Sequence, residues 1–192
     1  MGWQEACAAV AALGLCVSSG TGDLIIDSGT GETLDVDYYV GDGANTSYMI
    51  VDFSVTGGGC YAFGYRWNTG LEPTYAFEMH IAVSSVMGGL VWEWDTAGEF
   101  GAFTINFEYE GDVGDPDNFW AYWTAEPADI DPGVDWNFSN VGVSLRPLVD
   151  GSLDGWINTF EPGAEPCVPT VPGPGGLALL TAPLLLRRRR RR

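Results

Sequence analysis

The sequence predicts an α+β fold dominated by β-structure, in which an antiparallel sheet or sandwich is covered by one helix. Runs of alternating apolar and polar residues, bounded by Gly and Asp, are typical of strands and recur along the 192-residue chain. The 27 glycines and 11 prolines favour short strands joined by turns. One stretch has apolar residues at helical spacing instead. A hydrophobic content of 46% is enough for a single buried core.

Four segments are expected in this order: a signal peptide at 1–20, a β-rich extracellular domain at 21–162, a Pro/Gly linker at 163–174 and an apolar, arginine-ended tail at 175–192. Strands are expected within the domain at 23–27, 33–40, 47–55, 60–67, 90–95, 102–111, 118–125, 142–149 and 155–160.

The expected helix covers about 73–87. Pro73 lies near its start and two glycines follow its end, as is common at helix boundaries. Its apolar residues at helical spacing are Met79, Ala82, Val83, Val86 and Met87. A single helix among strands predicts that this helix covers one face of a sheet.

The first 20 residues have the layout of a secretory signal peptide. An apolar core at 6–17 precedes the small residues Ser18, Ser19 and Gly20, where cleavage is expected. The flank before the core contains Glu5 and lacks the usual basic residues. A buried helix of the folded domain is the alternative.

The chain ends with a proline-rich stretch, a 12-residue apolar run and a block of arginines. A helix of 12 residues spans about 18 Å, short of the ~30 Å hydrocarbon core, so it is a poor permanent anchor. The arginines would hold the end of the tail on the cytoplasmic side of the membrane. An ordinary single-pass anchor is the alternative.

Residues 168–192 resemble the PEP-CTERM class of bacterial sorting signals. The motif residues are Pro172, Gly173 and Pro174, where the class has Pro-Glu-Pro, followed at the end by Arg187, Arg188, Arg189, Arg190, Arg191 and Arg192. The resemblance implies export, transient attachment to the membrane and processing by an exosortase-type enzyme. The export machinery and that enzyme are the expected partners.

Two short stretches of the domain carry further resemblances. "YAFGYRWN", followed by a helix with "EMHIAV", resembles an uncharacterised bacterial extracellular domain that occurs with such tails. "FWAYWTA" and the later "VGVSLRPLVDGSLDGW" resemble the β-grasp module of transcobalamin-like proteins. Neither resemblance implies a catalytic residue in this chain.

The domain is strongly acidic. Residues 21–166 hold 25 of the 26 carboxylates, with Arg66 and Arg146 as their only basic residues. Such a surface repels phosphate backbones, which argues against nucleic-acid binding. No cofactor is expected, but calcium is a candidate because loop carboxylates suit a hard cation. The candidate ligands are Asp112, Asp115, Asp117, Asp129, Asp131 and Asp135. Aspartates gathered by chance in acidic loops are the alternative.

Catalysis through histidine would depend on His80, the only histidine of the chain. Its place on the expected helix favours an ordinary surface or interfacial histidine. A hydrolase that uses a pair of carboxyl groups is a further alternative. With 25 carboxylates in the domain, the sequence does not indicate which two would form the pair.

Aromatic side chains are the domain's other unusual feature. Trp92 and Trp94 would share one face of a strand, and Trp120 and Tyr122 would share a face opposite Trp123. If exposed, such a face would stack on sugar rings or another planar ligand. Filling of the sandwich core is the favoured reading.

Removal of the leader would leave two cysteines, Cys60 and Cys167, in an oxidising compartment. The sequence allows two alternatives: the two cysteines form a disulfide, or both remain free thiols. The expectation from these observations is an exported, non-enzymatic protein at the cell envelope, the surface or the extracellular matrix. A secreted module that binds carbohydrate or a larger cofactor is the alternative, with extracellular polysaccharide as a possible partner.

Overall fold

The computed structural model describes residues 24–96, 98–159 and 161–173. A six-stranded sheet with the order β10-β9-β11-β4-β5-β3 forms its centre. The strands of this central sheet are β3 (Tyr38–Gly41), β4 (Asn45–Asp52), β5 (Cys60–Trp67), β9 (Trp120–Ala125), β10 (Asn137–Phe138) and β11 (Leu153–Asn158). The expected signal peptide at 1–20 and tail at 175–192 lie outside the described residues.

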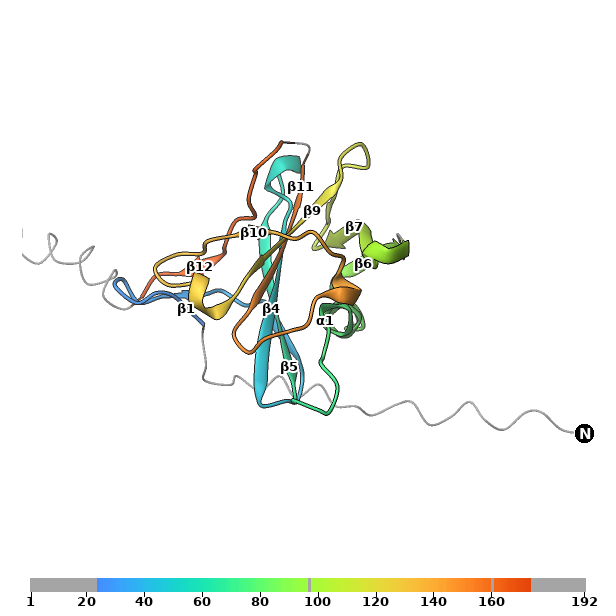
Figure 1. Ribbon diagram of the computed structural model, residues 1–192. Helices are drawn as coiled ribbons and strands as arrows, with labels where there is room; N and C mark the ends of the chain where they lie inside the picture. The colour runs from blue at the N-terminus through green and yellow to red at the C-terminus, as the bar shows by residue number, and fades with distance from the viewer. Residues whose placement is uncertain (1–23, 97, 160, 174–192) are drawn as a thin grey trace, which may run out of the picture.

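Smaller elements lie on both sides of the central sheet (Figure 1). On one side is a three-stranded sheet of β1 (Ile25–Asp27), β2 (Glu32–Leu34) and β12 (Thr170–Val171). On the other are the helix α1 (Ala76–Ser84) and a sheet of β6 (Val91–Thr96), β7 (Ala102–Tyr109) and β8 (Asp112–Val113). Short 3-10 helices cover Ser54–Thr56, Gly98–Phe100, Pro127–Asp129 and Val143–Leu145.

The prediction of a β-dominated α+β fold with one covering helix is confirmed. The central sheet is mixed rather than purely antiparallel. β4 pairs antiparallel with β5, and β9 with β11, but β11 runs parallel to β4 and β3 runs parallel to β5. Parallel neighbours need a long connection, and the chain between β4 and β11 carries α1 and the β6–β8 sheet.

Two apolar clusters form, one on each face of the central sheet. Strand alternation sends Met49, Val51 and Phe53 to the face under α1, while Tyr48 and Ile50 point to the opposite face. The same alternation separates Trp120 and Tyr122 from Trp123, as the sequence predicts. Burial of both faces explains why β4 and β11 are buried over nearly their whole length.

The helix is shorter than the expected 73–87. The Glu78 carboxylate accepts a hydrogen bond from the Tyr75 backbone N–H at 2.6 Å, which caps the start of α1. At the other end, the Ser85 hydroxyl donates to the Ile81 carbonyl. Met87 therefore lies beyond the helix and is 96% exposed, although its spacing places it on the apolar face.

The strand expected at 142–149 is not formed. Val143–Leu145 is a 3-10 helix instead, and the backbone after it bonds to the start of α1. The Ala76 N–H donates to the Arg146 carbonyl, and the Leu148 N–H donates to the Thr74 carbonyl. Pro147, which has no N–H, can complete only part of a strand ladder.

The Pro/Gly stretch expected as a linker at 163–174 packs on the domain as far as Gly173. β12 pairs with β2, and the Asp35 N–H donates to the Pro169 carbonyl at 2.9 Å. The buried carboxylate of Asp52 also accepts a hydrogen bond from the Cys167 backbone N–H at 2.9 Å. These contacts make the described part of the stretch a component of the folded domain.

Candidate functional site

An aromatic pocket of about 310 Å³ opens on the α1 side of the central sheet, beside the edge strand β10 and its neighbour β9. Four phenylalanines line it and are each 42% to 60% exposed: Phe100, Phe103, Phe119 and Phe138. Buried Trp120, Tyr122 and Trp156 also contribute to its lining. The pocket is therefore an aromatic floor with an exposed aromatic rim.

Hydrogen bonds between two loops form one wall of the pocket. The Gly142 N–H donates to the Phe100 carbonyl at 2.7 Å, and the Ala102 N–H donates to the Ser144 hydroxyl at 2.9 Å. Gly101 has a φ of +83°, which favours glycine. A Cβ at Gly142 would overlap the Ala102 carbonyl oxygen, so this wall requires glycine at position 142.

The opposite wall comes from the edge of the central sheet. Phe138 lies on β10, opposite Trp123 of β9, and the two rings pack edge to face with centroids 5.3 Å apart. The next residue, Ser139, donates its N–H to the Tyr122 carbonyl at 2.9 Å. The Phe119 carbonyl accepts a hydrogen bond from the Thr159 N–H at 3.0 Å. Both rim phenylalanines are thus attached to ordered backbone.

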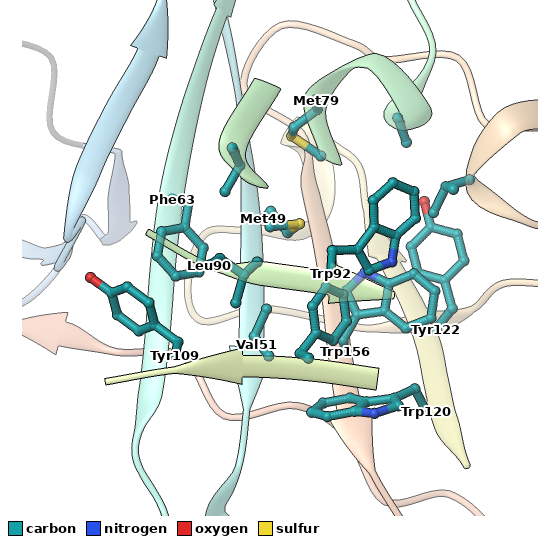
Figure 2. Packing of buried hydrophobic residues seen from close by; sticks show 14 of the residues in the cluster. Met49, Val51, Phe63, Met79, Leu90, Trp92, Tyr109, Trp120, Tyr122 and Trp156 are labelled. Atoms are coloured by element: carbon teal, nitrogen blue, oxygen red, sulfur yellow. The ribbon is translucent and has the colours of Figure 1, made fainter. Parts of the chain in front are cut away.

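The floor is a set of packed rings. Tyr122 and Trp156, neighbours across β9 and β11, are stacked with centroids 4.4 Å apart and 11° between their planes. Trp120 packs edge to face on Phe107 at 4.9 Å. Figure 2 shows Trp92, Trp120, Tyr122 and Trp156 gathered at one end of the cluster, with Phe63 and Tyr109 at the other.

A charged network lies behind the floor. The Tyr122 hydroxyl donates to the Asp154 Oδ2 at 2.7 Å, and Asp154 is fully buried. Arg146 Nε lies 3.6 Å from Asp154 Oδ1, and Arg146 Nη1 lies 2.7 Å from Glu126 Oε1. Burial raises the pKa of Asp154 to about 6, although Arg146 and Tyr122 favour its ionised form. Burial also raises the pKa of Tyr122 well above 10.

His80 is fully buried at the interface between α1 and the floor, so of the two expected places, surface or interface, the structure shows the interface. Its Nε2 accepts a hydrogen bond from the Trp156 indole at 2.8 Å, and its Nδ1 lies 2.7 Å from the Ala76 carbonyl oxygen. Burial lowers the pKa of His80 to about 4, although the Ala76 carbonyl favours the charged form. His80 does not line the pocket.

The six candidate calcium ligands are dispersed rather than gathered. Among the described residues, no group of three or more His, Cys, Asp or Glu side chains could hold a metal ion. The Asp112 carboxylate instead accepts hydrogen bonds from the Gly59 N–H and the Tyr61 hydroxyl. Asp115, Asp129 and Asp131 accept hydrogen bonds from nearby backbone N–H groups, and Asp117 and Asp135 are exposed loop residues.

Cys60 and Cys167 form a disulfide with a Cα–Cα distance of 6.4 Å. The bond joins the first residue of β5 to the segment that leads into β12. Of the sorting-motif residues, Pro172 and Gly173 are described, with Gly173 packed against the Thr30 and Gly31 carbonyls. Pro174 and the six terminal arginines lie outside the described residues.

The expectation that the tryptophans fill the core is confirmed for Trp92, Trp120, Trp123, Trp136 and Trp156, which are buried. Trp94 is 40% exposed. The pattern of tryptophan and tyrosine in the sequence does not indicate the rim phenylalanines. A usable signal is position: Phe100 and Phe119 each follow a segment rich in Gly or Asp, although the strand expected at 118–125 includes Phe119.

Comparison of the chain with protein-family models, curated proteins and solved structures gives no match. The resemblances of the sorting tail and of the domain therefore stay predictions. Within the described residues, no helix combines the length and the apolar character needed to cross a membrane.

Proposed function

We propose that this chain is an exported, non-enzymatic protein that is displayed at the cell surface or in the extracellular matrix through a processed C-terminal tail. The disulfide between Cys60 and Cys167 is the observation that carries the proposal. Disulfides persist in oxidising compartments outside the cytosol. The leader-like residues 1–20 and the resemblance of residues 168–192 to PEP-CTERM signals support the same location.

The folded domain acts as a binding module in this proposal. Its aromatic pocket has a concave shape and an apolar lining, as is usual for ligand sites. The lining contains no Asp, Glu, His, Lys, Arg or Cys side chain. Acid–base catalysis needs such groups within reach of the substrate, and a hydroxyl such as that of Ser139 needs one of them as a base to become a nucleophile. The pocket therefore favours binding over chemistry.

A hydrolase that uses paired acids is less well supported. Asp154 has the raised pKa that suits a general acid, and Glu126 belongs to the same network. However, Asp154 is fully buried behind Tyr122 and does not line the pocket. Its charge is directed at Arg146, which is the arrangement of a structural ion pair.

The location is tested on protein purified from the medium or cell surface of the native host. Intact mass should show loss of the leader and of the arginine block, and the denatured, non-reduced protein should contain no free thiol. The same protein after reduction should show two thiols, which controls for cleavage before Cys167. A full-length cytoplasmic product with free Cys60 and Cys167 would contradict the proposal.

The binding role is tested by titration of the exported protein with neutral glycans, corrinoids and small organic cations. Because Trp120 and Trp156 line the pocket, an occupied pocket should change the intrinsic fluorescence. If neither fluorescence nor calorimetry detects saturable binding, the ligand-binding role is contradicted. Display at the surface would then remain as the proposed function.

A further inference from the structure

The aromatic pocket combines two properties that select among ligand classes. Its lining has no charged side chain, and its polar side chains are the phenol of Tyr122, the indoles of Trp120 and Trp156, Ser139 and Asn140. The Tyr122 hydroxyl is engaged by Asp154, and the Ser139 hydroxyl donates to the Val141 carbonyl at 2.8 Å. For a ligand that needs many hydrogen bonds, the free-energy cost of losing its bound water would exceed the gain from the few hydrogen bonds that this lining can form.

The surroundings of the pocket are strongly negative. The 25 carboxylates of residues 21–166 are opposed by two arginines. Two exposed carboxylates lie beside the rim in the chain: Glu99 directly precedes Phe100, and Asp117 lies two residues before Phe119. This field repels anions and raises the local concentration of cations at the mouth of the pocket.

Aromatic rings attract a cation through the negative potential of their faces, and the attraction is stronger where water is excluded. A primary ammonium is strongly hydrated and would leave its N–H donors unpaired against this lining. A quaternary ammonium has no N–H donor, and its methyl groups can contact the rings directly. The volume of about 310 Å³ is at the small end for ligand pockets and suits such a head group.

We propose that the aromatic pocket binds a quaternary ammonium group of the trimethylammonium type. Phe100, Phe103, Phe119 and Phe138 form the cage around the cation, over the floor of Trp120 and Trp156. The acidic surface supplies long-range attraction, and the rings supply the contact. The inference rests on the proposed binding role and names the ligand class of that same pocket.

The test compares choline with 3,3-dimethyl-1-butanol, its neutral isostere, by tryptophan fluorescence and calorimetry on the exported protein. Choline should saturate a single site and bind about tenfold or more tightly than the isostere, which is the factor expected from about 1.4 kcal/mol of cation–π attraction. Added sodium chloride should weaken choline binding and leave binding of the isostere unchanged.

Three variants locate the site. Phe138→Leu and Phe100→Leu keep apolar bulk but remove a ring, and both residues are 60% exposed, so each substitution removes little buried surface. Each should weaken choline binding severalfold with little effect on the isostere. Met87→Leu, a change at an exposed apolar residue that does not line the pocket, should leave both affinities unchanged.

The outcomes distinguish the proposed binding role of the domain from the proposal that its ligand is a quaternary ammonium group. Equal affinity for choline and the isostere would overturn the cation inference and keep an apolar binding pocket. Binding of a neutral glycan, with none of choline, would overturn the inference and keep the binding role with polysaccharide as the partner. No binding of any of the three would overturn both.

Discussion

The indole N–H of Trp156 donates to Nε2 of His80 at 2.8 Å, inside the core between the central sheet and α1. An indole nitrogen can only donate, so Nε2 must be the unprotonated nitrogen of the imidazole. The proton then lies on Nδ1, which donates to the Ala76 carbonyl at 2.7 Å. Both ring nitrogens are satisfied only while His80 is neutral, and this has a direct consequence for stability against pH.

Replacement of His80 by Gln should change how stability depends on pH. The pKa of His80 is lowered to about 4 from 6.5, so the unfolded chain binds the proton more readily between these values. The contribution of His80 is therefore present above pH 6.5 and lost as pH falls toward 4. The free energy of unfolding of wild type minus that of His80→Gln should fall by about 3 kcal/mol over this range. Urea unfolding at pH 7 and pH 4 measures it, and a constant difference would contradict the assignment.

Replacement of Asp154 by Asn should change the pH dependence of stability in the direction opposite to that of His80→Gln. The pKa of Asp154 is raised from 3.8 to about 6, so the folded protein binds this proton more tightly. Its stabilising contribution is complete below pH 3.8 and lost as pH rises through 6. The stability of wild type relative to Asp154→Asn should fall by about 2 kcal/mol between pH 4 and pH 7.

Glu72→Gln, at an exposed carboxylate, controls for the change in net charge in the Asp154 experiment. If Asp154→Asn and Glu72→Gln change the pH dependence of stability equally, then overall charge, and not the buried network, determines that dependence. Between pH 4 and 6, His80 and Asp154 change the free energy of unfolding in opposite directions. The free energy of unfolding of wild type alone should therefore vary little over this range as a result of these two groups.

The sequence predicted those parts of the fold that follow from local periodicity. Alternation along 47–52 and 120–125 correctly divides the side chains between the two faces of the central sheet. The parallel pairing of β4 with β11 was not predictable in the same way, since it joins segments about a hundred residues apart. β10 and β12, with two residues each, are too short to produce a periodic signal.

The candidate site was less accessible than the fold. Its aromatic rim comes from three separate parts of the chain, at 100–103, 119 and 138, and only folding brings them together. The sequence does not decide between a surface and an interfacial place for His80, because its burial depends on a partner 76 residues away, Trp156. The candidate calcium ligands have the right chemistry, but four of the six carboxylates accept backbone hydrogen bonds that order loops.

Loss of the disulfide should destabilise the domain. The bond closes a loop over a sequence separation of 107, for which the chain-entropy model gives a stabilisation of up to about 4–5 kcal/mol. Cys167→Ser should lower the free energy of unfolding toward this limit while the backbone bond to Asp52 remains possible. The midpoint of guanidinium unfolding measures it. Equal midpoints for oxidised wild type, reduced wild type and the variant would contradict this role.

Gly142→Ala should damage the pocket wall. A Cβ there would lie 2.7 Å from the Phe100 carbonyl oxygen and overlap that of Ala102, although the φ of −77° suits alanine. The wall must shift, at a cost of about 1–3 kcal/mol in stability, and the pocket should lose affinity for its ligand. Gly70→Ala is the matched control, because a Cβ there meets its nearest atom at an ordinary 3.6 Å. Equal behaviour of the two variants would contradict the steric argument.

The position of the disulfide also determines how the domain would bear mechanical load. A pull on the chain beyond Gly173 would first peel the two-residue pairing of β12 from β2. The force would then reach Cys167 and pass through the covalent bond to Cys60, at the start of β5. β5 lies between β4 and β3 and pairs with β4 over eight residues, so traction enters the sheet at a well-anchored strand. A domain tethered through its C-terminal segment would thereby pass part of the load directly to β5, in addition to the backbone path from Cys167 to β11.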